Sequence, residues 1–153
     1  MKICLAKKTD LKGIKSLLDE QHIFHEKLSP EIFKFHPMNK KEILKIIESD
    51  EKNFIIAKKA NKVIALIQVE QKNTGDNPII VKKDYVYIQE MFIKEPYRRK
   101  GLGAKLMKEA KEWAKKKNIN ILRTSVVPNN YQATAFYEKE GFTSFMESLE
   151  MEI

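Results

Sequence analysis

Cysteine is almost absent from this chain of 153 residues, and so are long apolar runs. The single cysteine, Cys4, cannot form a disulfide within the chain, which is typical of proteins in a reducing cytoplasm. No apolar run approaches the roughly 20 residues that span a bilayer, and the first residues lack the apolar core of a signal peptide. We therefore expect a cytoplasmic protein with no membrane partner.

Arginine is scarce as well, and the net charge of +8 comes almost entirely from lysine. The three arginines are Arg98, Arg99 and Arg123, and the lysines are scattered along expected helix faces as a solvated surface. A single-strand nucleic-acid binder would interleave basic and aromatic residues along its strands, which this chain does not. A basic nucleic-acid-binding module remains an alternative function, but we expect no nucleic-acid partner.

Metal-binding signatures are also missing. The histidines His22, His25 and His36 do not match a zinc spacing, and there is no cysteine pair to join them. We therefore expect no metal site.

The hydrophobic pattern predicts one domain over residues 1–153, without repeats, low-complexity tracts or linkers. Helical periodicity begins after Thr9 or Asp10, after Asn39, after Gly101 and after Asn129 or Asn130, and Ser29 with Pro30 predicts a short helix. Strands are expected at about 2–7, 54–58, 63–71, 86–93 and 120–127, with a final strand or hairpin within 142–151. Asn61 is expected in a tight turn between the second and third of these strands. This order of elements indicates an α/β domain with a mixed sheet.

The most informative stretch runs from an apolar strand through a basic turn into an amphipathic helix. The turn is Pro96-Tyr-Arg-Arg-Lys-Gly-Leu-Gly-Ala104. A helix start offers unpaired N–H groups and a positive dipole end, and Gly101 and Gly103 leave that backbone open to an anion. The spacing fits neither a Walker loop nor a dinucleotide fingerprint. The turn therefore predicts a phosphate or pyrophosphate site of another kind.

Two motifs together resemble those of the GCN5-related N-acetyltransferase (GNAT) family. Arg98-x-x-Gly101-x-Gly103 is similar to the family's acetyl-CoA signature, and the stretch from Val126 to Phe142 is similar to its second motif. In that stretch an asparagine precedes a short helix that ends in Phe-Tyr-x-x-x-Gly-Phe. Taken alone, the first motif is also consistent with a plain glycine-rich helix start.

The resemblance implies a single-domain α/β GNAT-like fold with a mixed, twisted sheet of six or seven strands and helices on both faces. It implies acetyl-CoA as cosubstrate and a primary amine as acceptor. Many members of the family form homodimers, which makes a homodimer an assembly to test for here. The residues that it assigns to the cofactor are Phe92, Ile93, Arg98, Arg99, Lys100, Gly101, Leu102, Gly103, Ala104, Asn130, Ala133 and Phe136.

Two residues are candidates for proton transfer. By the resemblance, Tyr137 is the acid at the departing thiolate, and a phenol is protonated at neutral pH. Glu90 is the candidate base: it interrupts an apolar strand, where we expect it on one face with Ile88 and Phe92, and a buried carboxylate needs a partner. The competing interpretation of Glu90 is a purely structural partner of other side chains.

The aromatic segment after the first helix is expected to form one wall of the acceptor pocket. Its candidates are Phe24, His25 and Phe33, and simple core packing is the alternative interpretation. The sequence thus predicts direct acetyl transfer from acetyl-CoA to an amine of a small molecule. An acetyl-CoA-binding sensor without turnover is the alternative within the same fold.

Overall fold

A mixed five-stranded sheet with the order β1-β2-β3-β4-β5 forms the centre of the fold. The computed structural model describes all residues from 1 to 153. The strands are β1 (Lys2–Leu5), β2 (Lys52–Lys59), β3 (Lys62–Asn73), β4 (Asp84–Ile93) and β5 (Leu122–Arg123). Neighbouring strands are antiparallel except for β4 and β5, which are parallel.

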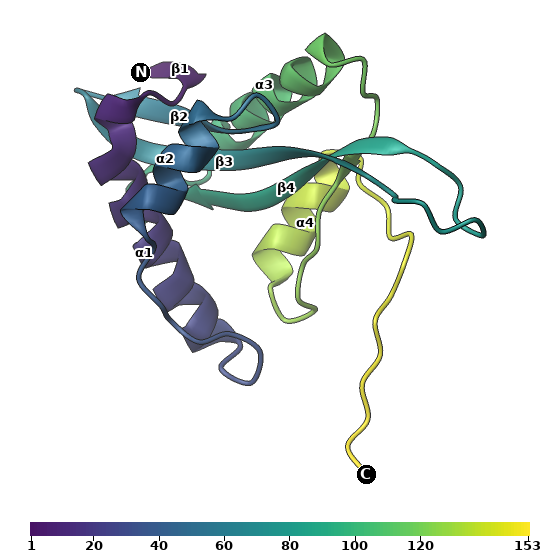
Figure 1. The fold of residues 1–153 in the computed structure, drawn as a ribbon. Helices are drawn as coiled ribbons and strands as arrows, with labels where there is room; N and C mark the ends of the chain where they lie inside the picture. Colours follow the sequence, from purple (N-terminus) through teal and green to yellow (C-terminus); the bar gives the residue numbers. More distant parts are fainter.

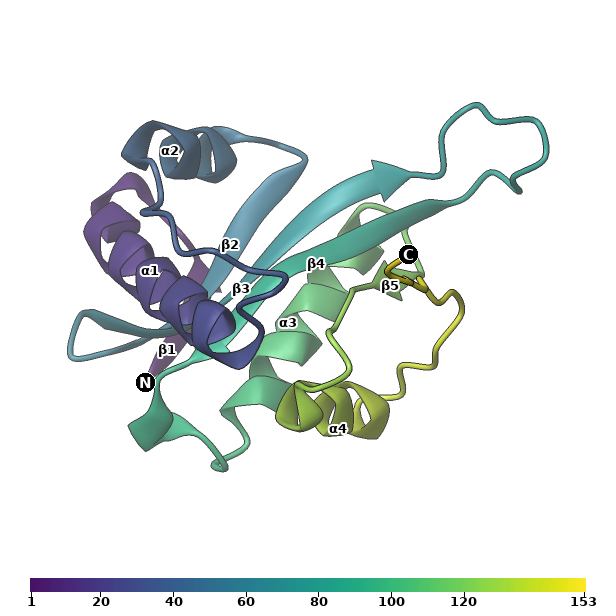
Figure 2. The same ribbon diagram turned by 90° about the horizontal axis from the view of Figure 1, so that it is seen from below.

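Helices cover both faces of this sheet (Figures 1 and 2). The helices are α1 (Leu11–Leu28), α2 (Lys40–Glu48), α3 (Leu102–Lys116) and α4 (Tyr131–Lys139), with short 3-10 turns η1 (Lys8–Asp10) and η2 (Glu95–Tyr97). The helices α1 and α2 pack on one face, and α3 and α4 lie on the other. None of these helices combines the length and the apolarity needed to cross a membrane.

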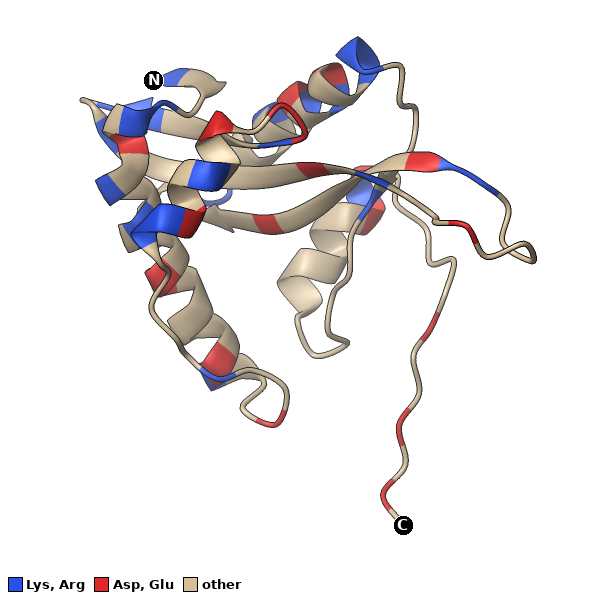
Figure 3. Ribbon diagram, in the orientation of Figure 1, with Lys and Arg blue, Asp and Glu red and all other residues tan.

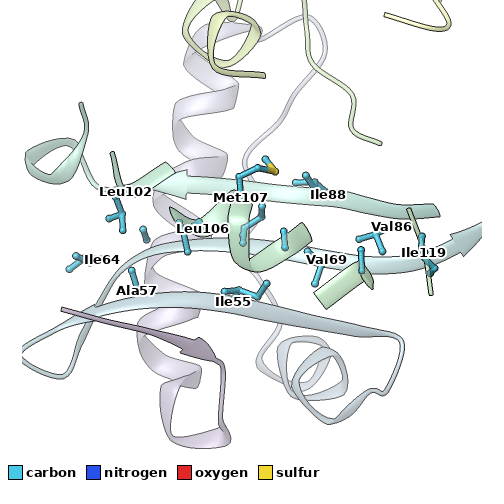
Figure 4. Close-up of a cluster of buried hydrophobic side chains, with 14 residues drawn as sticks. Ile55, Ala57, Ile64, Val69, Val86, Ile88, Leu102, Leu106, Met107 and Ile119 are labelled. Carbon is cyan, nitrogen blue, oxygen red and sulfur yellow. The ribbon is translucent and has the colours of Figure 1, made fainter. Parts of the chain in front are cut away.

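Two apolar cores hold the layers together, one on each face. The larger core joins the buried stripe of α3, which includes Leu102, Leu106 and Met107, to the sheet (Figure 4). The smaller core joins Leu17 and Leu18 of α1 to the opposite face. Each fully buried side chain of this size contributes about 1.5–3 kcal/mol, so the helical periodicity in the sequence fixes which face of each helix is covered.

The β2–β3 hairpin shows how local sequence sets the register of the sheet. Ala60 and Asn61 form its turn and both have positive φ, at 47° and 62°. Two consecutive positive φ values define the tight turn whose twist matches that of paired strands. The turn that was expected at Asn61 is therefore confirmed.

Four expectations differ from the structure. The sheet has five strands rather than six or seven, β5 is only two residues long, and residues 142–153 form no strand. The short helix at Ser29–Pro30 is also absent, because the Ser29 hydroxyl donates to Asn129 Oδ1 at 2.9 Å instead of capping a helix. A segment forms a strand only where another strand pairs with its main chain. The alternation of apolar and polar residues in a sequence does not show whether such a partner strand is present.

A β-bulge in β4 determines which way Glu90 points. Gln68 of β3 lies opposite Glu90, but Val69 lies opposite Ile88, so Gln89 is an extra residue in β4. An extra residue reverses the alternation of side chains between the two faces. Ile88 therefore packs in the α3 core, whereas Phe92 packs in the α1 core. The expectation that Ile88 and Glu90 share a face is wrong for this reason.

The parallel strands β4 and β5 pair over a short distance only. Their register joins Val86 to Leu122 and Tyr87 to Arg123, and no further pair follows. Beyond Ile88, whose carbonyl accepts from Thr124 Oγ1 at 3.0 Å, β4 has no strand on that side. The main chain of the second half of β4 is therefore free of a strand neighbour along one edge.

One asparagine ties the end of α1 to the loop before α4. Asn129 Oδ1 accepts from the Ser29 hydroxyl, and Asn129 Nδ2 donates to the Leu28 carbonyl, both at 2.9 Å. Ser29 is fully buried. The two hydrogen bonds connect helices that lie on opposite faces of the sheet.

We predict that Asn129→Ala lowers the free energy of unfolding by about 1–3 kcal/mol, because it leaves the buried Ser29 hydroxyl without its partner. Urea denaturation measures the change. Asn77→Ala is the control: Asn77 caps an exposed turn by accepting from Ile79 N, and we expect its effect to stay within about 0.5 kcal/mol. Equal effects of the two substitutions would contradict the bridging role of Asn129.

Candidate active site

The turn before α3 presents a row of main-chain donors. None of the N–H groups from Arg99 to Ala104 donates a hydrogen bond within the chain. Arg99 and Gly101 have positive φ, at 61° and 75°, which bends the chain into the helix start. The unused donors coincide with the positive end of the α3 dipole. This arrangement is suited to an anion with several oxygens.

The side chains of this turn divide into two kinds. Arg98 Nε donates to the Ile93 carbonyl at 2.7 Å, and the guanidinium lies 5.1 Å from the centre of the Phe92 ring. Lys100 Nζ donates to the Pro96 carbonyl at 2.8 Å. Arg98 and Lys100 therefore fasten the turn to the end of β4 and to η2, while Arg99 makes no such contact.

The two glycines serve different purposes. Gly101 has open space around it and is required by its left-handed backbone. At Gly103 a Cβ would lie 2.9 Å from Phe136 Cε2 and 3.5 Å from Ile93 Cδ1. Gly103 is therefore the point where α4 rests against the start of α3, in addition to leaving the helix start open.

The free edge of β4 exposes alternate main-chain groups. Lys94 N donates to the Ile64 carbonyl of β3, so the antiparallel ladder points Phe92 N–H toward β3 as well. The N–H groups of Met91 and Ile93 then point to the opposite edge. The carbonyls of these two residues already accept hydrogen bonds. The Met91 carbonyl accepts from Gln21 Nε2 at 3.2 Å, and the Ile93 carbonyl accepts from Arg98 Nε. The arrangement leaves N–H donors, and not acceptors, along this edge.

Glu90 has a partner on α1. His22 Nε2 lies 3.1 Å from Glu90 Oε1, and both side chains are largely buried. Hydrogen bonding to Glu90 raises the pKa of His22, against a smaller effect of burial, and a backbone hydrogen bond to His36 adds to the increase. In its charged form the His22 ring donates from Nε2 to the Glu90 carboxylate.

The three acceptor-wall candidates lie together. The His25 ring stacks on Phe33 at 5.1 Å between centres and lies 5.9 Å from Phe24. Burial lowers the pKa of His25, so this ring is neutral where His22 is charged. The Glu90 charge also acts on His25, which brings this aromatic cluster within electrostatic reach of Glu90.

Tyr137 enters the same region from α4. Its ring packs edge-on against Phe136 and Phe142, at 5.4 and 5.2 Å. Burial raises the pKa of Tyr137, with a smaller opposite effect from the Thr124 hydroxyl and a further increase from the Glu90 charge. The phenol is therefore held protonated beside the point where β4 and β5 separate.

The remaining candidates have structural contacts. Asn130 caps α4, since its side-chain oxygen accepts from Ala133 N at 3.2 Å. Leu102 is buried in the α3 core, so its main chain alone is available at the turn. No group of three His, Cys, Asp or Glu side chains is arranged to hold a metal ion.

The structure thus joins Glu90, Tyr137 and the His25 cluster in one region, with the turn of α3 at the end of β4. Sequence reasoning missed two contributors, His22 and Gln21, both on α1. The available signal was the placement of polar Gln21, His22 and His25 on one expected helix; the structure adds that Gln21 is only 3% exposed. Their contacts cross about 70 residues of sequence, which no local pattern reveals.

Comparison with known proteins identifies the family. The sequence model of the acetyltransferase (GNAT) family matches residues 14–142. The chain belongs to this family. Among curated relatives, it is 31% identical over 123 residues to L-ornithine N5-acetyltransferase NATA1 of Arabidopsis thaliana, a match that covers 80% of this chain and 52% of that protein. The chain spans about half the length of the curated relatives that it matches.

Solved structures share the GNAT fold of this chain. The tetramutant of the BH1408 protein from Bacillus halodurans aligns with a TM-score of 0.91 at 20% identity, over 100% of both chains. Aminoglycoside N-acetyltransferase AAC(6')-Iy in complex with CoA aligns with a TM-score of 0.75 at 15% identity, over 99% of this chain and 98% of the other. At these identities the likeness concerns the fold.

We predict that Gly103→Ala is unfavourable because its Cβ displaces the Phe136 ring. Alanine also gains up to about 1 kcal/mol in helix propensity over glycine, which opposes this cost. The quantity to measure is therefore the coupling free energy between positions 103 and 136. Gly103→Ala should be more favourable by at least about 0.5 kcal/mol when Phe136→Leu makes room. Thermal or urea unfolding of the four variants completes the cycle, and additive effects would contradict the contact.

We predict that Glu90→Gln lowers the pKa of His22, because it removes the main cause of the increase and leaves burial to act in the opposite direction. In the unaltered protein the pair stabilises the fold fully below the ordinary histidine pKa of about 6.5. That contribution is lost as the pH rises through the raised folded-state pKa. An NMR titration of the His22 ring measures the change.

The control for this titration is Glu20→Gln. Glu20 lies on α1 beside Lys94, at 4.0 Å, and should leave the His22 titration unchanged. An unshifted His22 pKa in Glu90→Gln would mean that the contact does not govern its charge.

Proposed function

We propose that residues 1–153 form a single N-acetyltransferase domain, which moves the acetyl group of acetyl-CoA directly to a primary amine of a small molecule. The observation that carries this proposal is the row of unused N–H groups from Arg99 to Ala104 at the start of α3. In a member of the acetyltransferase family, such a row is suited to the pyrophosphate of the cosubstrate. Arg99, free of internal contacts, supplies charge beside it.

The edge of β4 supports the placement of the cosubstrate's arm. An extended amide chain needs main-chain partners, and the N–H groups of Met91 and Ile93 face the side that β5 leaves open. Gln21 and Arg98 occupy the carbonyls of these two residues. We assign the donor role to Met91 and Ile93, and we give Phe92, whose N–H faces β3, the role of packing beneath Arg98.

The acid and base follow from the surroundings of Tyr137 and Glu90. The ammonium form of a primary amine has a pKa of about 10. It must therefore lose one proton before the nitrogen attacks the thioester carbonyl. Glu90 accepts that proton, directly or through a water. As the new C–N bond forms and the C–S bond breaks, the thiolate takes the phenolic proton of Tyr137. The nitrogen releases its second proton to the solvent as the amide forms, and a solvent proton restores the Tyr137 phenol. The raised pKa of Tyr137 keeps this proton in place until the thiolate develops.

His22 sets the orientation of Glu90 in this scheme. Its ring is fixed between the Glu90 carboxylate and a main-chain group of His36, so one carboxylate oxygen of Glu90 is engaged by His22. The charge of His22 lies beside Glu90, so turnover should change with pH as His22 loses its proton.

The acceptor meets α1 and the loop after it. Phe24, His25 and Phe33 form an aromatic wall in which burial lowers the pKa of His25, and Glu90 supplies the negative charge that attracts an ammonium group. The relative that acts on ornithine and the aminoglycoside acetyltransferases of the same fold take amines carried on small polar molecules. A small amine of this kind is the acceptor that we propose.

A thiol-release assay with acetyl-CoA and a panel of small amines tests the proposal. We expect turnover with at least one amine, and a kcat about 10²-fold lower in Tyr137→Phe with a nearly unchanged KM for acetyl-CoA. Tyr131→Phe, on the same helix but 78% exposed, is the matched control and should keep full activity. Binding of acetyl-CoA without thiol release for any amine would identify a sensor and contradict the enzyme.

A further inference from the structure

The buried face of α1 contains one amide among apolar side chains. Ile14, Leu17 and Leu18 on this face are at most 1% exposed, and Gln21 is 3% exposed. The spacing of positions 14, 17, 18 and 21 is that of a helix face covered by its neighbours, where an apolar side chain packs without leaving polar atoms unpaired. A glutamine at this place must instead find partners for its amide.

Only one end of the Gln21 amide has such a partner. Gln21 Nε2 donates to the Met91 carbonyl at 3.2 Å, whereas Gln21 Oε1 is the one buried side-chain nitrogen or oxygen atom without a hydrogen bond. The reverse orientation of the amide would set its oxygen against the Met91 carbonyl oxygen, so this contact fixes which atom is left over. A buried acceptor without a donor lowers the stability of a fold, and its retention points to a use in binding.

The unused oxygen belongs to the region of the proposed acid and base. It shares an amide with Nε2, so it lies within a few ångström of the Met91 carbonyl in β4. The next residue of α1, His22, contacts Glu90, which directly precedes Met91. His25 of the aromatic wall lies one helical turn from Gln21. The base, the aromatic wall and the unused oxygen are therefore gathered around the same stretch of β4.

The chemistry of this oxygen restricts what it can bind. A carbonyl oxygen only accepts, so its ligand must bring an N–H or O–H donor. Glu90 is the one charged residue between Tyr85 and Ile93 in β4 (Figure 3), so no cation of this stretch opposes a positive ligand. An ammonium group brings several N–H donors together with a positive charge. It therefore suits the Gln21 oxygen and the Glu90 carboxylate at the same time.

We propose that Gln21 Oε1 accepts a hydrogen bond from the reacting nitrogen of the acceptor amine, and that Gln21 thereby orients this nitrogen. The proposal rests on the acetyl transfer proposed above. After the ammonium group gives one proton to Glu90, the neutral nitrogen keeps two N–H bonds and a lone pair. An N–H held by Gln21 restricts the rotation of the nitrogen, which favours attack on the thioester. The surrounding protein covers Oε1, so binding requires a small displacement of the side chains that cover it.

Kinetics of Gln21→Met, with an amine that supports thiol release, test this proposal. Methionine is close to glutamine in size but has no amide. We expect the KM for the amine to rise at least about tenfold, because a hydrogen bond to a charged group is lost. The Kd for acetyl-CoA, measured by calorimetry, should change less than about twofold. Gln132→Met, which makes the same change at an exposed position of α4, is the matched control and should keep both values.

Two further measurements separate binding from a structural role. Thermal unfolding of Gln21→Met should occur at the same or a higher temperature, because the substitution removes an unpaired buried oxygen from an apolar face. A lower unfolding temperature would assign the amide to the fold and overturn the proposal. In the unaltered protein, the NMR signal of the Gln21 side-chain amide should shift when CoA and the amine are added together, and an unshifted signal would contradict the contact.

The outcomes distinguish this proposal from the proposed function. Thiol release by the unaltered protein, with an unchanged KM for the amine in Gln21→Met, would overturn the role of Gln21 and leave the enzyme in place. A weaker Kd for acetyl-CoA with an unchanged KM for the amine would assign the oxygen to an N–H of the cosubstrate, which also overturns it. A chain that releases no thiol with any amine contradicts the enzyme itself, and this proposal with it.

Discussion

The bulge at Gln89 is the constraint on which the candidate site depends. One extra residue turns the second half of β4 over, so that Glu90 faces α1 and meets His22. The same half of β4 lacks a strand on its outer edge, because β5 pairs only with Val86 and Tyr87. A regular strand would place Glu90 against the α3 core, where no partner awaits its charge. Side-chain chemistry and main-chain donors thus meet in the same half of β4.

The helix start at Gly101 and Gly103 is coupled to the rest of the site by packing. Phe136 of α4 rests where Gly103 lacks a side chain, and Tyr137 packs next to it. Arg98 links the same turn to Ile93 at the end of β4. The anion site, the donor edge and the phenol are therefore positioned relative to one another by close contacts, which favours the preorganisation that acyl transfer needs.

The parts of the fold that follow local rules could be predicted from the sequence. The apolar stripe of α3, the turn at Asn61 and the glycine-bearing helix start depend on neighbours in sequence, and the family resemblance added the order of elements. The pairing of His22 with Glu90 joins residues 68 positions apart, and the bulge depends on the register of two strands. The expected last strand failed for a related reason: Leu149 and Met151 have strand periodicity, but a strand also needs a paired neighbour, and residues 142–153 have none.

The bridge through Asn129 has a consequence for motion. The site lies between α1 on one face of the sheet and α4 on the other. The continuous ladder of β3 and β4 holds the sheet between them, whereas the end of α1 is joined to the loop before α4 by two hydrogen bonds of the Asn129 amide. The low-energy fluctuation of such a frame is a hinge that opens at the amide, since local opening follows the weakest set of contacts. Molecules exchanging with the solvent would pass the Asn129 end, while the β4 end stays rigid.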